Sequence, residues 1–202
     1  MHIKSIFDYI NSSKIISHFR KFIELSSQDE KELDKFFKSK IFSKKEHLLL
    51  EGSRCKYHYF VLTGCLRLYY INEKGIDQTI QFAIEDWWLT DYNAFSHQSN
   101  ANFSIQAVEK TEVIILDHKD QEELLLKFPK LERYFRLLYQ KAYAASQFRI
   151  KYLFNYSRED IYHHFNDNFP EFTNRIPQNL LATFLNMTPE YLSEIKAKKR
   201  KK

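Results

Sequence analysis

The sequence predicts an α+β fold in which an antiparallel β roll is followed by a long helix and then by a helix-turn-helix. All three glycines lie between residues 52 and 75, whereas all four prolines lie in the last third of the chain. Around the glycines, segments rich in aromatic and β-branched residues recur at about 8–12-residue spacing, which is typical of short strands joined by turns. From about residue 119 the apolar period changes from two residues to near 3.6, the period of a helix.

The composition indicates a globular protein. Of the 202 residues, 44% are hydrophobic and 16% are aromatic, which is enough for a packed core. No apolar run approaches the ~20 residues that cross a bilayer, and the first residues lack the apolar segment of a signal peptide, so we expect a cytoplasmic protein without a membrane partner. The two cysteines, Cys55 and Cys65, are too few for a disulfide framework, and we interpret them as ordinary strand residues.

The β roll is expected to contain about eight strands. Its glycines Gly52, Gly64 and Gly75 lie 12 and 11 residues apart, as expected for turns between strands. The strand-like segments are YHYFVLT (57–63), CLRLYYI (65–71), DQTIQFAI (77–84), FSIQAV (103–108) and TEVIILD (111–117). Before the roll, Ser27 is placed to cap a helix with Glu30 three residues later, the spacing of a capping box.

Two helices are expected after the roll. KDQEELLLKF (119–128) predicts a short helix, and a helix of roughly seven turns follows from Pro129. One stripe of the long helix has 4-3-4-3-4-3 spacing and consists of Leu131, Phe135, Leu138, Ala142, Ala145, Arg149 and Tyr152. The spacing predicts a homodimer through Leu131, Phe135, Leu138, Ala142 and Ala145, because a heptad stripe needs a partner. The alternative is that the stripe packs on the chain's own β roll, and a helix with two apolar faces can do both.

The segment PQNLLATFLNMTPEYLSEIKAKKRKK (177–202) predicts two short helices joined by a tight turn. Pro177 suits the first turn of the first helix, and Asn186 ends it, because asparagine tolerates the left-handed backbone conformation that such a turn requires. Thr188 then caps a second helix that begins at Pro189. The inward faces are formed by Leu181, Phe184, Leu185, Leu192 and Ile195, with Ala182 leaving room for the crossing.

A helix pair of this kind, followed by a lysine run, is typical of a helix-turn-helix that binds DNA. N-terminal residues of the second helix would reach base edges in the major groove, and the lysines would contact phosphates. The formal charge is only +5, but the basic excess is concentrated in the last seven positions. The candidate DNA-binding residues are Gln178, Thr188, Pro189, Glu190, Ser193, Glu194, Lys196, Lys198 and Lys199. The alternatives are a helical hairpin that only completes a core and a solvated terminal charge run.

The order β roll, long helix, helix-turn-helix resembles the cyclic-AMP receptor/FNR (Crp/Fnr) family of bacterial transcription regulators over nearly the whole chain. The motifs that carry the resemblance are YFVLTGCLRLYY, the glycine at 75, QAVEKTEVIIL and IPQNLLATFLNMTPEYLSEIK. The last motif, within RIPQNLLATFLNMTPEYLSEIKAKK, is similar to the compact C-terminal ends of Bacteroidetes members. The resemblance implies a jelly-roll sensor domain, like a cyclic-nucleotide-binding domain, in residues 1–128. It also implies a dimerisation helix in 129–156 and a helix-turn-helix domain in 157–202.

The resemblance also implies a homodimer in which each helix-turn-helix enters one half-site of a palindromic operator. Where the family commonly has arginines and a glutamate facing the bases, this chain has Pro189, Glu190 and Glu194. Only the glutamate at 190 is retained, and it can accept a hydrogen bond from a cytosine amino group. Glu194 would repel phosphates and guanine acceptors, which implies a target sequence different from the usual one. No β hairpin is expected after the second helix.

The resemblance does not extend to the phosphate-binding residues of a cyclic-AMP site. Family members that bind cyclic AMP use a Gly-Glu pair at the start of a short helix and a later Arg-Ser pair. Here we expect Leu89-Thr90 and Ala101-Asn102 in those places, and no lysine or arginine occurs from Phe82 to Val108. We expect a filled roll or an apolar-ligand pocket, with an effector other than cyclic AMP. The candidate pocket residues are Trp87, Trp88, Thr90, Tyr92, Ala101, Asn102 and Phe103.

Two other classes of function compete with a transcription regulator. A cupin-like enzyme needs clustered histidines and a carboxylate on neighbouring strands, and the roll has no His-x-His pair. We therefore expect no catalytic residues, no metal site and no cofactor. A ligand-binding module whose terminal helices contact a protein is the other alternative. The expected partners are double-stranded DNA and a second copy of the chain, and RNA polymerase and a small-molecule effector are further candidates.

Overall fold

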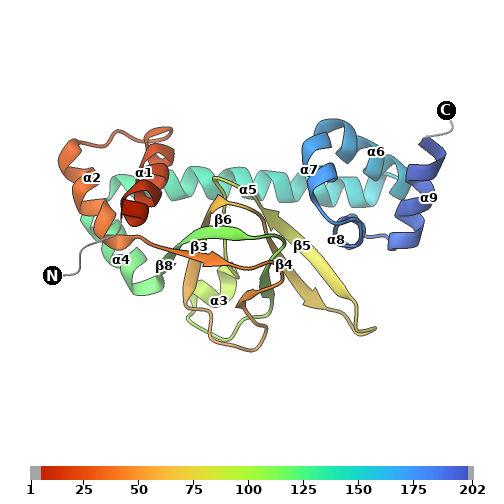
Figure 1. The fold of residues 1–202 in the computed structure, drawn as a ribbon, viewed down its shortest axis with the longest axis horizontal. Helices are drawn as coiled ribbons and strands as arrows, with labels where there is room; N and C mark the ends of the chain where they lie inside the picture. The colour runs from red at the N-terminus through yellow and green to blue at the C-terminus, as the bar shows by residue number, and fades with distance from the viewer. Residues whose placement is uncertain (1–5, 200–202) are drawn as a thin grey trace. The chain divides into compact units, whose positions relative to one another are not determined.

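The computed structural model describes the backbone of residues 6–199 and the side chains of residues 13–198 (Figure 1). Contacts within the chain divide it into two compact units. Unit 1 comprises residues 1–68 and 82–139, and unit 2 comprises residues 69–81 and 140–202. The residues of the long helix are therefore shared between the two units, and a short β segment in the middle of the sequence belongs to unit 2.

The roll consists of two four-stranded sheets, which confirms the predicted number of strands. One sheet has the order β1-β8-β3-β6 and the other β2-β7-β4-β5. The strands are β1 (Lys38–Phe42), β2 (His47–Leu49), β3 (Tyr57–Thr63), β4 (Leu66–Ile71), β5 (Asp77–Ala83), β6 (Trp88–Leu89), β7 (Ser104–Ala107) and β8 (Thr111–Asp117). The β1–β8 and β3–β8 pairs are antiparallel, as predicted.

Gly64 occupies a turn that only glycine fits. Its φ is +99°, in the region that L side chains rarely adopt, and it follows a register shift between β3 and β8. A Cβ atom at this position would lie 2.6 Å from Thr111 Oγ1 and 2.7 Å from Thr111 Cα. The Thr111 hydroxyl oxygen accepts a hydrogen bond from the backbone N–H of Cys65 at 3.1 Å. The predicted turn glycine therefore allows β8 to approach the β3–β4 connection.

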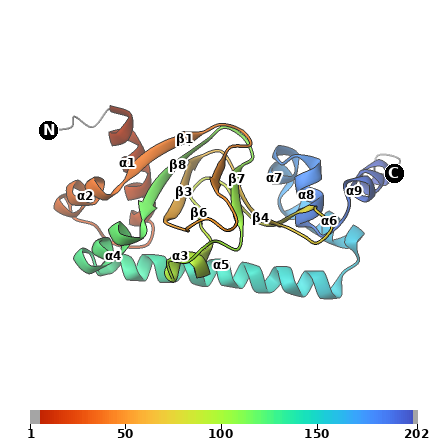
Figure 2. The ribbon, with the colours of Figure 1, turned by 90° about the horizontal axis from the view of Figure 1, so that it is seen from below.

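Two hydrophobic clusters form the core of unit 1. The roll cluster fills the space between the sheets with side chains from both, including Leu49, Tyr59, Leu66, Leu89 and Ile105. The helix cluster lies on the other face of the β3–β8 sheet and contains residues of the helices that flank it. Within this unit α1 (Ile6–Arg20), α2 (Ser27–Leu33) and α4 (His118–Lys127) gather with the first turns of α5 (Lys130–Asn155) (Figure 2).

The capping box before the roll exists, but its residues are Ser26 and Asp29. The predicted pair, Ser27 and Glu30, is wrong by one residue. Ser26 has an extended backbone, and its hydroxyl accepts from the N–H of Asp29 at 3.1 Å. The Asp29 carboxylate in turn accepts from the N–H of Ser26 at 2.8 Å. Both spacings fit a capping box, so only the backbone conformation decides between them.

The 26-residue α5 confirms the predicted long helix, but part of its predicted dimer stripe is buried in unit 1. Leu131 and Phe135 are 0% and 3% exposed in the helix cluster, and Leu138 packs against it. Assigning Leu131 and Phe135 to a dimer interface was therefore wrong. The alternative, packing on the chain's own core, holds for this end of the helix. Ala142 is half-buried and Ala145 is exposed.

Unit 2 contains the C-terminal helices and the tip of the β4–β5 hairpin. Its helices are α6 (Arg158–Asn168), α7 (Pro170–Arg175), α8 (Gln178–Phe184) and α9 (Pro189–Lys199). Ser157 caps α6, because its hydroxyl accepts from the N–H of Asp160 at 3.2 Å. A small apolar core holds these helices together and includes Tyr162, Ile176, Leu181, Leu192 and Ile195. The core is built on α8 and α9, the two helices that the terminal sequence predicts.

Candidate functional site

The turn between α8 and α9 has the geometry that the sequence predicts. Asn186 has a φ of 58°, in the left-handed region. The backbone N–H of Tyr191 donates to the Thr188 hydroxyl at 3.2 Å, so Thr188 caps α9 and Pro189 is its first residue. Pro177 precedes α8 rather than forming its first turn. The predicted inward residues Leu181, Leu185, Leu192 and Ile195 are buried, and Phe184 is half-buried.

The outward face of α9 is polar and accessible. Glu190, Ser193, Glu194 and Ala197 are exposed, and Pro189 is half-buried. No large apolar side chain is exposed on this face within residues 189–198. A helix whose first residues are exposed and polar, on a pair held by its own small core, can enter a groove of DNA.

Gln178 and Ser193 connect the two helices to each other. The Gln178 side-chain amide donates to Ser193 Oγ and, at 3.4 Å, to the carbonyl oxygen of Pro189. The Ser193 hydroxyl itself donates to the Pro189 carbonyl at 2.9 Å. Both residues are candidate DNA-binding residues, and here their side chains hold α8 and α9 in a fixed relative position.

The predicted phosphate-binding lysines of α9 have contacts within unit 2. The Lys198 ammonium lies 3.8 Å from a carboxylate oxygen of Glu159 on α6, and the Lys196 ammonium lies 5.9 Å from the centre of the Tyr162 ring. Lys198 is exposed and Lys196 is half-buried. The side chain of Lys199 and all of residues 200–202 lie outside the described residues. No pattern in the sequence indicates Glu159, because its proximity to Lys198 depends on how α6 packs against α9.

The end of α8 is contacted by residues that are distant in sequence. The Arg149 guanidinium on α5 donates to the carbonyl oxygens of Phe184 and Ile80, and Gln78 on β5 donates to the carbonyl oxygen of Thr183. Arg149 belongs to the heptad stripe of the long helix that the sequence shows. Its actual partners lie 35 and 69 residues away, and no periodic pattern in the sequence indicates them.

The predicted effector pocket does not form as one cavity. Trp88 belongs to the helix cluster, where its indole N–H donates to Tyr134 Oη at 2.8 Å, whereas the next residue, Leu89, belongs to the roll cluster. Successive side chains of a strand point to opposite faces, so Trp88 cannot line the roll interior. Thr90 and Ala101 are buried, Trp87 and Phe103 pack against the roll cluster, and Tyr92 and Asn102 are exposed.

A carboxylate lies at the start of the short helix where a cyclic-nucleotide site would be built. The helix is α3 (Tyr92–Ser96), and Asp91 is its N-cap residue, so the expected Leu89-Thr90 pair lies immediately before the cap. Asp91 is buried, and its two carboxylate oxygens accept from the N–H of Ala94 at 3.1 Å and of Asn102 at 2.8 Å. Backbone N–H groups that could meet an anionic ligand are thus already bound to the chain's own carboxylate.

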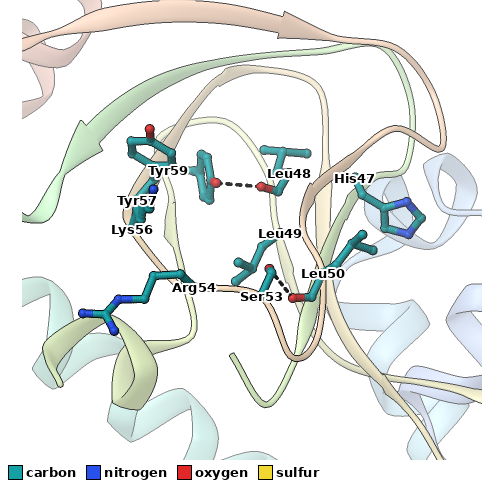
Figure 3. A pocket seen from close by; sticks show the side chains of 9 residues that line it. All are labelled: His47, Leu48, Leu49, Leu50, Ser53, Arg54, Lys56, Tyr57 and Tyr59. Atoms are coloured by element: carbon teal, nitrogen blue, oxygen red, sulfur yellow. Dashed lines mark hydrogen bonds between the residues drawn. The ribbon is translucent and has the colours of Figure 1, made fainter. Parts of the chain in front are cut away.

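An open hollow of about 260 Å³ lies over residues 47–59 (Figure 3). Its walls include Leu48 and Tyr59, whose hydroxyl donates to the Leu48 carbonyl at 2.8 Å. Arg54 and Lys56 border it, and both lie outside residues 82–108, the segment that has no lysine or arginine. None of the predicted pocket residues lines this hollow.

The C-terminal half of α5 has a second apolar stripe that the sequence reasoning missed. Tyr143, Ile150 and Phe154 are 67%, 52% and 85% exposed, and Leu153 is also exposed. Tyr143 and Ile150 lie seven residues apart, and Leu153 follows Ile150 by three, which is the spacing of a coiled-coil seam. The signal is present in the sequence, but heptad spacing alone does not show which of two stripes is buried.

Within residues 6–199, no group of three or more His, Cys, Asp or Glu side chains is arranged to hold a metal ion. None of the helices in the described part of the chain has the length and apolar character of a membrane span.

The comparisons with known proteins agree with this architecture. Residues 39–128 match the family model of the cyclic nucleotide-binding domain. No curated protein sequence matches the chain. Three solved structures illustrate the similarity in fold. FixK2 from Bradyrhizobium japonicum has a TM-score of 0.70 at 14% identity, covering 80% of this chain and 83% of its own.

The other two are similar over comparable lengths. A CooA mutant from Carboxydothermus hydrogenoformans has a TM-score of 0.66 at 16% identity, covering 83% of this chain and 78% of its own. The catabolite activator protein of Thermus thermophilus has a TM-score of 0.54 at 16% identity, covering 86% of this chain and 83% of its own. Residues 39–128 therefore match the cyclic nucleotide-binding domain, and the chain has the fold of the Crp/Fnr regulators, as the resemblance in sequence predicted.

Proposed function

We propose that the protein is a homodimeric DNA-binding transcription regulator of the Crp/Fnr type, that it has no enzymatic activity, and that it reads a palindromic operator. The observation that carries the proposal is the α8–α9 pair. It has a left-handed Asn186 turn, a Thr188 cap and an exposed polar face on α9. The exposed polar face leaves α9 free to contact DNA, and the turn and cap fix its first turn in position.

In this proposal α9 is the recognition helix. Glu190 lies in its first turn and is exposed, so it can accept a hydrogen bond from a cytosine amino group in the major groove. Lys196, Lys198 and the following basic residues contact phosphates, which gives affinity without sequence preference. Glu194 disfavours bases that present only acceptors, so the operator differs from those read by arginine-bearing recognition helices.

The proposed dimer forms through the exposed stripe of Tyr143, Ile150, Leu153 and Phe154 on α5. This stripe replaces the predicted one, whose first residues are buried in unit 1. Large exposed apolar side chains at heptad spacing match the seam of a two-helix coiled coil. A two-fold dimer presents two recognition helices, and for that reason its operator is a palindrome.

Selection of bound sequences from random duplex DNA tests the proposal most directly. We expect a palindrome whose half-sites are centred about 10 base pairs apart, one helical turn. The affinity for the selected operator should fall steeply as salt rises, because bound lysines release counterions from the phosphates. Enrichment of no sequence, together with binding that does not depend on salt, would contradict DNA recognition and favour a module that acts through protein contacts.

A further inference from the structure

The last turn of α8 is held by side chains that do not belong to the helix pair. The final carbonyl groups of a helix have no partner within the helix and must find one elsewhere. In α8 the carbonyl of Leu181 accepts from the N–H of Leu185, and that of Ala182 accepts from the N–H of Met187 at 3.0 Å. The carbonyl of Thr183 accepts from the N–H of Asn186 at 3.1 Å and also from a side chain of β5, and the carbonyl of Phe184 accepts from a side chain of α5.

Arg149 supplies the donor from α5. Its Nη2 donates to the Phe184 carbonyl at 2.9 Å, its Nη1 donates to the Ile80 carbonyl of β5, and its guanidinium carbon lies 4.4 Å from the centre of the Phe184 ring. No carboxylate of the described residues is paired with this guanidinium, and desolvation lowers its pKa. The positive charge instead lies at the negative end of the α8 dipole. Only a planar guanidinium can bridge two carbonyls and stack on a ring at once.

The hairpin tip completes the contact. The Gln78 amide donates to the Thr183 carbonyl, and the fully buried Thr79 places its hydroxyl oxygen 3.2 Å from that of Thr183. Three segments of unit 2 therefore meet at the last turn of α8, immediately before the Asn186 turn that leads into α9. We name this contact the α8 clamp and define it by Arg149, Gln78, Thr79, Thr183 and Phe184.

We propose that the α8 clamp sets the position of the recognition helix relative to the C-terminal half of α5, and thereby the half-site spacing that the dimer accepts. The inference rests on the proposed function. α9 is fixed to α8 by the Gln178 bridge and by the buried Leu181, Leu192 and Ile195, so holding the end of α8 also holds α9. The dimer stripe lies on the same half of α5 as Arg149. The distance between two recognition helices then depends on the angle between α8 and the C-terminal half of α5.

The preferred half-site spacing shows whether the α8 clamp positions the recognition helix or only stabilises the fold of unit 2. The selected operator would be compared with versions carrying one base pair more or fewer between the half-sites. We expect the wild-type protein to bind the altered operators at least about tenfold more weakly, since hydrogen bonds to a charged group resist the required rotation. Arg149→Ala and Gln78→Ala should bind all three operators with similar affinity while remaining dimeric. Arg149→Lys should resemble Arg149→Ala, because lysine keeps the charge but cannot bridge the two carbonyls.

Lys151→Ala is the matched control, since it removes an exposed cation from the same helix two residues away. It should retain the wild-type spacing preference. Gln78→Ala deletes a single side-chain donor at the hairpin tip, so it still tests the clamp if Arg149→Ala does not fold. Arg149→Ala and Gln78→Ala proteins that keep the wild-type spacing preference would overturn the inference.

Amide hydrogen exchange gives a test that does not require DNA. We expect the backbone N–H groups of residues 185–187 to exchange about ten- to a hundredfold faster in Arg149→Ala than in the wild type, and not in Lys151→Ala. If the wild-type protein binds no DNA, the proposed function fails. Faster exchange in the Arg149→Ala and Gln78→Ala variants alone would then still support the clamp, and unchanged exchange would overturn it.

Discussion

His58 is a fully buried histidine on β3 that holds no charge in the folded protein. Its Nδ1 lies 3.1 Å from Gln121 Oε1, and because an amide oxygen can only accept, the proton is on Nδ1. Its ring centre lies 4.4 Å from that of Trp88 and 6.1 Å from that of Phe135. Burial lowers the pKa of His58 to about 4, against the 6.5 of an exposed imidazole.

This histidine should make the stability of unit 1 depend on pH. Between pH 6.5 and about 4 the unfolded chain binds a proton that the folded chain does not, so the free energy of unfolding falls as the pH falls. We expect His58 to contribute a loss of about 2 kcal/mol between pH 7 and pH 5. Chemical denaturation at both values would measure it. His58→Phe should reduce the difference by that amount, and His97→Gln, at an exposed histidine, should not.

Residues whose role depends on local chemistry could be predicted from the sequence. Asn186 and Thr188 act on neighbouring backbone, and the structure confirms both. Asp91 and Arg149 could not be predicted, since the first depends on where a short helix begins and the second on partners 35 and 69 residues away. The capping pair was displaced by one residue because two serines in succession both satisfied the spacing.

α5 shows what periodicity can and cannot predict for a whole element. Its length and approximate bounds follow from the 3.6-residue period, and the structure agrees. The period did not distinguish the face that contains Leu131 and Phe135, which the core of unit 1 covers, from the face that contains Tyr143 and Ile150. Both faces carry heptad spacing, and only the arrangement of the other elements decides which is covered.

The exposed stripe of α5 gives a direct test of the dimer. Ile150→Glu should yield a monomer in sedimentation velocity and abolish operator binding, because a carboxylate in a coiled-coil seam loses its hydration without a partner. Lys151→Glu introduces the same carboxylate on the neighbouring exposed position and should remain dimeric. A dimeric Ile150→Glu protein would place the interface elsewhere. Leu138 is not suited to this test, since it packs against the core of unit 1.

The roll should not bind cyclic AMP or cyclic GMP. Its interior is filled by the roll cluster, the Asp91 carboxylate occupies backbone N–H groups beside α3, and no lysine or arginine occurs between Phe82 and Val108. Desolvating a phosphate without a paired cation costs several kcal/mol. Isothermal titration calorimetry should therefore show no heat of binding at micromolar nucleotide. Saturable binding in that range would mean that Arg54, Lys56 or another cation outside this segment supplies the charge.

For the whole molecule, the lysines of α9 should determine the affinity for DNA of any sequence, whereas Glu190 should determine the sequence preference. Lys196→Ala and Lys198→Ala should weaken binding to every sequence and lower the salt slope by about one each. Glu190→Ala should instead relax the preference at one base pair, by about 1–3 kcal/mol. Binding titrations at several salt concentrations would measure both. Equal loss of discrimination from Lys198→Ala and Glu190→Ala would show that the two roles are wrongly divided.

Glu159 provides a further test of the role of Lys198 in DNA affinity. Its carboxylate lies 3.8 Å from the Lys198 ammonium and competes with phosphate for that lysine. Glu159→Gln should therefore tighten binding to all sequences, whereas Lys119→Ala, at an exposed lysine of unit 1, should leave binding unchanged. Weaker binding by Glu159→Gln would indicate that the ion pair positions Lys198 and does not compete for it.

The discontinuity of unit 2 has a consequence for the order of events during synthesis. The contact between Thr79 and Thr183 closes a separation of 104 residues. At about 5–20 residues per second, the hairpin tip leaves the ribosome on the order of 5–20 s before α8 does. Over that interval Gln78 and Thr79 have none of their later partners, while most strands of the roll are already available. Nascent chains stalled within residues 140–177 should therefore expose the hairpin tip to proteases and chaperones, and this exposure should end only when α8 has been made.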